Sequence, residues 1–139
     1  MERGEVWWTF IGEKCPVVLL SGDGSCGFRA IQIVTPATAD ERQGFLVLTG
    51  EEATDPQVVQ QAIGPSQAAY RAIGIEVKLG AGEGLPVDGV VRVAFPRDGQ
   101  IYCTWLVTVV PDTLMEKAGE LSSPKLDELA NALRLAGVE

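Results

Sequence analysis

Residues 3–27 constrain the fold more than any other stretch, because two strand-like runs and a glycine-rich turn follow one another there. Glu5 to Phe10 combines aromatic and β-branched residues, and Gly12 interrupts this run. Pro16 to Leu20 is wholly apolar and of strand length, and the segment Ser21 to Gly27 holds three glycines. The stretch therefore predicts a β-hairpin followed by a glycine-rich turn.

Pro16 has no backbone N–H and cannot donate to a strand ladder, so we expect it at the first position of its strand. That places Lys14 and Cys15 at the mouth of the hairpin, where side chains meet solvent or substrate. The glycines of the turn could aim backbone N–H groups at a phosphate, with Ser21 beside them, or form only a flexible hairpin loop. The turn lacks the Lys-Ser/Thr ending of a phosphate-binding loop, which favours the plain loop.

Further strands are predicted by apolar or alternating runs between turn residues. They are Phe28 to Val34, Phe45 to Thr49, Gly74 to Leu79, Val90 to Phe95 and Ile101 to Thr108. The alternation in the third of these places Glu76 and Lys78 outward. Asp98-Gly99 lies between the last two runs and predicts a hairpin tip that carries Arg97.

Helices are expected at three places: Val58 to Ile63, Asp112 to Ala118, and a last helix with Ser123 as N-cap, Pro124 at its first position and Gly137 at its end. Asp55 and Pro56 provide a start signal for the first of them. Residues 40–73 are the least regular part of the chain. We expect a lid or support at one end of the fold there. The loop between the first two strands, Ile11 to Cys15, is short, and residues 40–73 could also substitute for a longer loop at that place.

The chain of 139 residues is long enough for one compact core, and we expect a single domain over 1–139. Its net charge of −8 disfavours non-specific adhesion to nucleic acid or anionic membrane, although a local basic patch remains compatible with it. No apolar run approaches the ~20 residues that span a bilayer, and no secretory signal opens the chain. A soluble, cytoplasmic protein without a membrane partner is expected.

Cysteine occurs at positions 15, 26 and 103, and histidine is absent from the sequence. This set offers little to an ordinary zinc site, so we expect reduced thiols, no metal and no cofactor. Cys103 lies inside an apolar run and is expected in the core. Cys15 and Cys26 lie beside the expected site, but no histidine could activate a thiolate, so a nucleophilic role is the less favoured interpretation.

Three segments together resemble the PemK/MazF family of toxin endoribonucleases: RGEVWW at 3–8, PVVLLS at 16–21 and PAT at 36–38. The resemblance covers most of the chain apart from about 40–73. It implies a mainly β fold with helical additions, namely a small SH3-like antiparallel β-barrel with a C-terminal helix. It also implies a homodimer, single-stranded RNA as substrate and an antitoxin peptide as partner.

The family's arginine before the proline is Cys15 in this chain, and the nearest cation is Lys14. In this family RNA is cut by its own 2′-hydroxyl, and the protein moves protons and stabilises the anionic phosphorane. The resemblance assigns the catalytic hydroxyl to Thr38, and Lys14 or Arg29 would supply positive charge. The candidate substrate-binding residues are Trp8, Cys15, Ser21, Arg29 and Arg97.

Three functions remain open on the sequence. The first is a toxin-type endoribonuclease. The second is a binding protein of the same shape without catalysis, which the negative charge and the missing arginine favour. The third is a barrel recruited to small-molecule biosynthetic chemistry, with an apolar substrate held near Cys15, Cys26 and Thr38.

Overall fold

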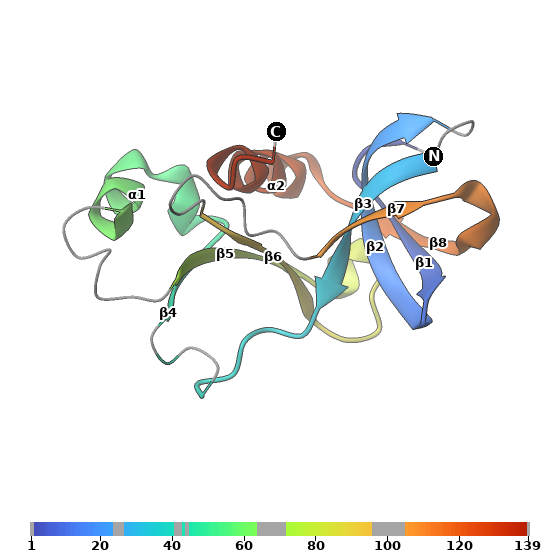
Figure 1. Cartoon of the computed structure of the whole chain (residues 1–139), viewed down its shortest axis with the longest axis horizontal. Coiled ribbons are helices and arrows are strands. Elements are labelled where there is room, and N and C mark those ends of the chain that lie inside the picture. The colour runs from blue at the N-terminus through green and yellow to red at the C-terminus, as the bar shows by residue number, and fades with distance from the viewer. Residues whose placement is uncertain are drawn as a thin grey trace.

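A computed structural model of the chain describes residues 2–23, 27–40, 43, 45–63, 72–95 and 105–138 (Figure 1). Within them are eight strands: β1 (Glu5–Ile11), β2 (Glu13–Asp23), β3 (Gly27–Val34), β4 (Phe45–Thr49), β5 (Ala72–Leu79), β6 (Gly89–Ala94), β7 (Leu106–Val109) and β8 (Leu114–Glu120). The helices are α1 (Pro56–Ile63) and α2 (Ser123–Leu135), and short 3-10 turns lie at Glu52–Thr54, Ala81–Glu83 and Pro111–Thr113. Arg97, Cys26 and Cys103 lie outside the described residues.

The strands form one sheet in the order β4-β5-β6-β3-β2-β1-β8, and β7 also pairs with β3. β3 is the central element, because Phe28 to Ile31 pair with β7 and the next residues, Ile33 and Val34, pair with β6. The expected antiparallel order holds except between β4 and β5, which are parallel. A parallel pair needs a crossover connection, and the segment with α1 supplies it.

The strands β7-β3-β2-β1-β8 curl into a small barrel with its own apolar interior. Only Val110 and the 3-10 turn Pro111–Thr113 separate β7 from β8, the two ends of this strand series. The interior is a buried cluster of Val17, Leu19, Phe28, Ala30 and Val109. Thr9 is fully buried beside it, and its hydroxyl donates a 2.8 Å hydrogen bond to the Thr113 carbonyl. The prediction of a small barrel with helical additions is confirmed.

A second and larger core lies between the sheet and α2, which runs across β5 and β6 in Figure 1. Leu129 and Leu133 of α2 are fully buried and belong to one cluster with Ile31 of β3 and Ile75 of β5. The two faces of β3 serve different cores, since Phe28 and Ala30 belong to the barrel interior whereas Ile31 and Ile33 belong to the larger core.

The first hairpin is tighter than predicted. Ile11 pairs with Glu13, so the turn is Gly12 alone, which has a φ of 72°. Lys14 and Cys15 therefore lie inside β2 and not in a loop. Pro16 is also interior, paired with Trp8, but pairing of β2 with β3 begins only at Val17. A residue without an N–H is tolerated at this boundary of the second ladder.

The helix predicted over Asp112 to Ala118 is wrong, since Leu114–Glu120 is β8. β8 pairs with β1 from Glu5↔Glu120 to Thr9↔Leu114 with two irregularities in register. The backbone hydrogen bonds of this ladder outweigh a weak local helix preference, which tertiary context often overrides.

The outward placement of Glu76 is also wrong, because this residue is only 3% exposed. Its face of β5 is covered by the segment that follows β3, from which the Ala37 N–H donates to Glu76 Oε2 at 3.1 Å.

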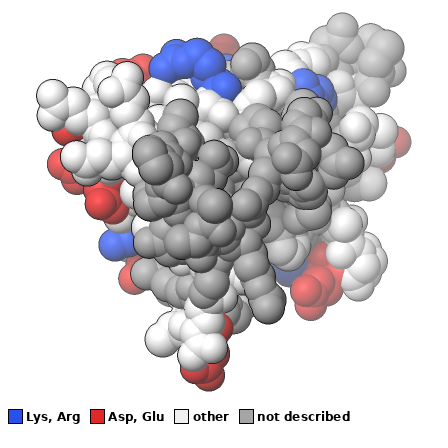
Figure 2. Space-filling view, turned by 60° about the vertical axis from the view of Figure 1, so that its left-hand side comes forward, with Lys and Arg blue, Asp and Glu red and all other residues white. Residues whose placement is uncertain are grey.

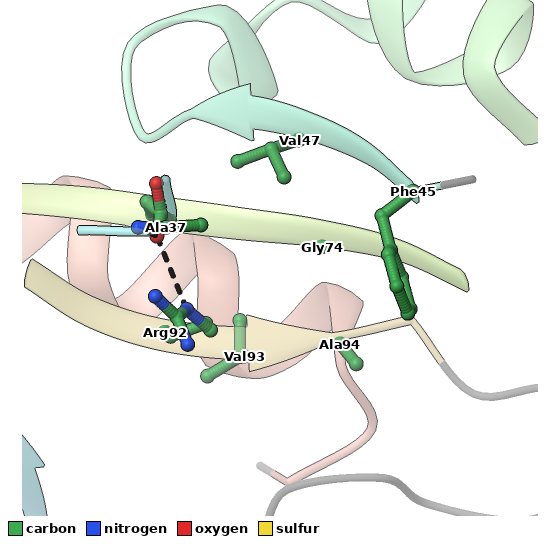
Figure 3. Close-up of a pocket in the computed structure, with 8 residues that line it drawn as sticks. Ala37, Phe45, Val47, Gly74, Arg92, Val93 and Ala94 are labelled. Atoms are coloured by element: carbon green, nitrogen blue, oxygen red, sulfur yellow. Dashed lines mark hydrogen bonds and ion pairs between the residues drawn. The ribbon is translucent and has the colours of Figure 1, made fainter. Parts of the chain in front are cut away.

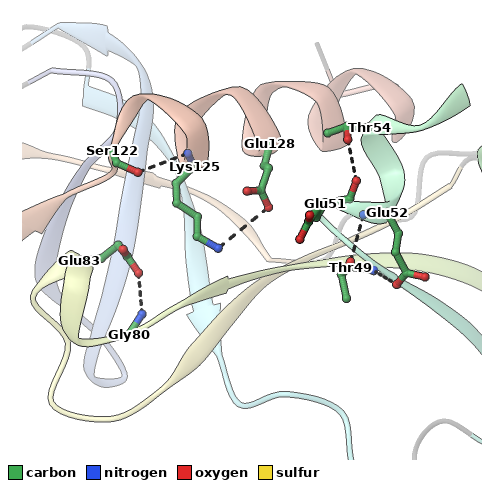
Figure 4. Close-up of polar contacts among 9 residues, drawn as sticks. All are labelled: Thr49, Glu51, Glu52, Thr54, Gly80, Glu83, Ser122, Lys125 and Glu128. Carbon is green, nitrogen blue, oxygen red and sulfur yellow. Dashed lines mark hydrogen bonds and ion pairs between the residues drawn. The ribbon is translucent and has the colours of Figure 1, made fainter.

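The last helix is confirmed, with its cap one residue earlier than expected. Ser122 is the N-cap, and its side chain accepts from the Lys125 N–H (Figure 4). At the other end Gly137 has a φ of 75°, and the Val138 N–H reaches the Leu133 carbonyl at 2.9 Å. Among the described residues, neither α1 nor α2 has the length and apolar composition of a membrane-spanning helix.

Asp55 is the N-cap of α1, as its position before Pro56 predicts, because its Oδ1 accepts from the Gln57 N–H at 2.9 Å. We expect Asp55→Ala to lower the free energy of unfolding by about 1 kcal/mol, the usual value of such a cap. Chemical denaturation followed by tryptophan fluorescence measures this. Asp112→Ala, at an exposed site, is the control and should change stability by less than about 0.5 kcal/mol. Equal stability of both variants would contradict the capping role.

Candidate functional site

A cleft of about 470 Å³ lies where the β1–β2 hairpin, the end of β3 and residues 85–89 meet. Trp8, Lys14 and Cys15 line it, so the structure brings three of the predicted site residues together. Thr35 and Trp105 also line it and were not expected there. The Gln32 N–H donates to the Trp105 carbonyl at 3.0 Å, and this backbone hydrogen bond holds Trp105 beside β3.

The Lys14 ammonium contacts two neighbouring side chains. Its Nζ lies 5.0 Å from the centre of the Trp8 ring and 3.4 Å from Glu116 Oε1. Both charged side chains are half or more exposed, so this ion pair is weak and can open for another anion. Lys14 therefore holds the Trp8 ring and remains available as a surface cation.

The two N-terminal tryptophans have different surroundings, because adjacent strand residues face opposite sides of the sheet. Trp8 packs on the larger core while also lining the cleft. Trp7 packs on the barrel interior, and its Nε1–H donates to Glu5 Oε1 at 2.8 Å. This hydrogen bond holds the pKa of the Glu5 carboxyl below its usual value, although burial acts in the opposite direction. Trp8 is thus the tryptophan of this pair that lines the cleft.

Lys14 and Cys15 point from opposite faces of the hairpin. Lys14 pairs with Phe10, whereas Cys15 pairs with Thr9, whose side chain is buried with the barrel interior. Burial raises the pKa of the Cys15 thiol, and the nearby Glu13 carboxylate raises it further. Cys15 is thus a half-buried, protonated thiol at neutral pH.

We expect Cys15 to be alkylated by iodoacetamide more slowly at pH 7.5 than a free cysteine, because the thiolate is the reacting form. The rate should rise with pH and reach its midpoint above the ordinary pKa of a cysteine thiol. Mass spectrometry of the peptide that contains Cys15 separates it from the other two thiols. A midpoint below the ordinary value would instead indicate an activated nucleophile.

Ser21 and Arg29 lie away from the cleft. They are direct cross-strand partners on β2 and β3, and both are exposed. Ser21 is six positions after Cys15 in β2, which is ~20 Å of extended strand. These two candidates belong to the other end of the barrel.

Thr38 is exposed and does not line the cleft. The segment before it is fixed by an ion pair that the sequence reasoning missed. Arg92 Nε donates to Glu76 Oε2 at 3.1 Å, and Arg92 Nη2 donates to the Thr35 carbonyl at 2.9 Å. Together with the bond from Ala37 to Glu76, these contacts hold residues 35–37 and so set the path of the chain at Thr38.

The ion pair lies at one side of a second pocket, of about 400 Å³ (Figure 3). Phe45 of β4, Gly74 of β5 and Arg92, Val93 and Ala94 of β6 line it, together with Ala37, Val47 and Glu76. Glu76 and Arg92 are cross-strand partners in β5 and β6. Only the register of these strands brings the two side chains together, so no sequence motif marks this pocket.

The first cleft does not have the concentrated positive charge that favours a phosphate ligand. Two carboxylates, Glu13 and Asp88, line it together with the cation Lys14. On the face shown in Figure 2, the visible Lys and Arg side chains of the described residues lie in separate places and do not form one patch. The described site therefore offers aromatic surface and hydrogen-bonding groups more than concentrated positive charge.

A scan against models of known protein families finds no match for this chain, and no curated protein matches its sequence. Its structure, however, is similar to a solved structure of the Mycobacterium tuberculosis toxin MazF-mt6, with a TM-score of 0.56 and 18% identity. That alignment covers 96% of this chain and 95% of the toxin.

A second similar structure is an endoribonuclease in complex with its cognate antitoxin from a mycobacterial species. The TM-score is 0.53 and the identity 14%, over 100% of this chain and 95% of the other. The chain therefore has a MazF-like fold, as the resemblance of its sequence to the PemK/MazF family predicts.

Proposed function

We propose that this protein is a toxin-type endoribonuclease that binds single-stranded RNA and cleaves it through attack of the RNA's own 2′-hydroxyl. The observation that carries this proposal is the MazF-like fold over almost the whole chain, shared with a toxin and with an endoribonuclease. The cleft lined by Trp8 and Trp105 supports it, because unpaired bases stack on aromatic side chains.

In this proposal Thr38 binds a non-bridging oxygen of the scissile phosphate and Lys14 supplies positive charge. Lys14 leaves Glu116 for the phosphate, since their exposed ion pair is worth little. A lysine is a point charge without the two-pronged geometry of an arginine, so cleavage should be slow. Cys15 stays a protonated thiol and takes no part in the chemistry.

The test is controlled expression in bacteria followed by sequencing of RNA 5′ ends. The expected result is arrested growth with breaks at defined sites in single-stranded regions. A matched strain expressing Thr38→Ala should grow and show no such breaks. Normal growth with intact RNA in both strains, at equal amounts of folded protein, would overturn the proposal.

We also propose that the protein is a symmetric homodimer and that an antitoxin peptide binds it. The second similar structure supports the antitoxin partner, because it is an endoribonuclease in complex with its cognate antitoxin. In the described part of the chain β8 is an edge strand that pairs with β1 alone, and its Met115 is 56% exposed. Such an edge favours association with a second copy. Light scattering at tens of micromolar should give twice the chain mass, and a monomer mass would contradict this prediction.

A second candidate function is favoured by the residues around Cys15. A half-buried thiol occupies the place of the family's arginine, and the carboxylates Glu13 and Asp88 share its cleft. This arrangement suits a protein that binds RNA or an antitoxin without cutting. RNA binding with no cleavage, in a protein whose antitoxin still binds, would favour this second function.

A further inference from the structure

The pocket beside Arg92 is separate from the Trp8 cleft and has the composition of a ligand site. Its volume of about 400 Å³ lies in the range of small-molecule pockets, about 300–1,000 Å³. In Figure 3 Phe45 stands at one end, and Arg92 lies beyond Val93 and Ala94 on the same strand. The pocket therefore suits a small molecule or base that packs against apolar side chains and forms hydrogen bonds with one arginine.

The charge state of the pocket decides what kind of group Arg92 can receive. Two bonds of its guanidinium go to Glu76 and the Thr35 carbonyl, and a guanidinium has five N–H groups, so others remain for a ligand. Glu76 is only 4% exposed and already balances the arginine. A carboxylate or phosphate would bring a second anion beside this buried carboxylate, so a neutral group with hydrogen-bond acceptors is favoured.

The walls favour a flat ligand. Phe45 is 39% exposed although it is a large apolar residue, and it presents its ring to the pocket (Figure 3). Val47, Val93 and Ala94 supply further apolar contact. A neutral, planar group with two adjacent acceptors at one edge meets all of these conditions. Guanine has this form, because its O6 and N7 together accept a bidentate pair of hydrogen bonds from an arginine.

We propose that this pocket binds a guanine base of the single-stranded RNA, stacked on Phe45 and read at O6 and N7 by Arg92. The inference rests on the proposed function and adds the base that is selected. Adenine presents an amino donor where guanine has O6, and the pyrimidines lack the N7 acceptor. Ala37 lines the pocket and Thr38 follows it directly, so the ribose and phosphate of the bound nucleotide lie near the proposed catalytic hydroxyl.

The test measures binding without cleavage. The probes are fluorescein-labelled oligodeoxynucleotides of five nucleotides, in which every base is thymine except the central one, which is varied. Each probe is titrated with the full chain, and binding is followed by fluorescence anisotropy. Central guanine should bind about tenfold more tightly than adenine, cytosine or thymine, the usual size of one two-pronged base contact. Hypoxanthine, which keeps O6 and N7, should bind like guanine, whereas 7-deazaguanine should bind like adenine.

Two variants assign the preference to the pocket. Arg92→Lys keeps the positive charge beside Glu76 but loses the two-pronged donor, and should abolish the preference for guanine. Phe45→Leu should weaken binding of the guanine oligonucleotide several-fold. Phe10→Leu is the matched control, since Phe10 is 61% exposed and does not line the pocket, and its binding should equal that of the natural protein.

Equal binding of all central bases would overturn the inference while leaving the RNA-cleavage proposal intact. Equal binding of guanine and 7-deazaguanine, with weaker binding of hypoxanthine, would show that the opposite edge of the base is read and would likewise overturn it. If no oligonucleotide binds and expression leaves RNA intact, both proposals fall together.

Discussion

Replacing Cys15 by arginine should raise the rate of RNA cleavage tenfold or more. The substitution restores the residue that the PemK/MazF family has before the proline, and one well-placed electrostatic donor is worth ~10²–10³ in rate. A gain below this range, of about tenfold, is the minimum expected here, because residue 15 shares a face of β2 with Glu13, whose carboxylate will compete for the new guanidinium. A single-turnover assay on mixed-sequence single-stranded RNA measures the change.

The matched variants are Cys15→Ser and Cys15→Arg combined with Thr38→Ala. Cys15→Ser should cleave like the natural protein and melt at nearly the same temperature, since the protonated thiol has no chemical role. The double variant should lose the gain. If all of these proteins fold and are equally inert, the chain is not a latent ribonuclease; if only the natural protein cuts, the cysteine is required.

Replacing Arg92 by methionine should lower the free energy of unfolding by about 3 kcal/mol, the largest effect we expect from one surface-accessible side chain. The change leaves Glu76, with 4% of its side chain exposed, without its partner, and removing one member of a buried ion pair typically costs ~3–5 kcal/mol. The lower end applies because Arg92 is 28% exposed. Guanidinium denaturation followed by tryptophan fluorescence measures the loss.

Lys14→Met is the matched control for this experiment. It also removes the cation of an ion pair, but Lys14 and Glu116 are 50% and 64% exposed, so the cost should stay below about 1 kcal/mol. Adding Glu76→Gln to Arg92→Met should recover part of the stability, because an uncharged amide is cheaper to bury than an unpaired carboxylate. Equal decreases in the free energy of unfolding for Arg92→Met and Lys14→Met would show that the buried ion pair contributes no more to stability than the exposed one.

Local sequence determined most of the elements of this protein. Runs of aromatic, β-branched or apolar residues placed β1, β3, β4 and β6, and alternation of apolar residues placed β5. Start and stop residues placed α1 and α2 to within one or two residues. These patterns succeed because side-chain spacing and caps act within a few residues of one another. The segments at 3–8, 16–21 and 36–38 also predicted the MazF-like fold that the similar structures confirm.

Tertiary structure decided what local patterns could not. β8 is a strand because β1 offers it a ladder, and β4 runs parallel to β5 because α1 carries the chain back across the sheet. The same is true of the site. Trp8, Lys14 and Cys15 were found from sequence because they are neighbours on one hairpin, although only the strand register shows that Lys14 and Cys15 face opposite sides. Glu76 and Arg92 are 16 residues apart and meet only when β5 and β6 pair, so their contact depends on long-range register, which the sequence of either strand alone does not specify.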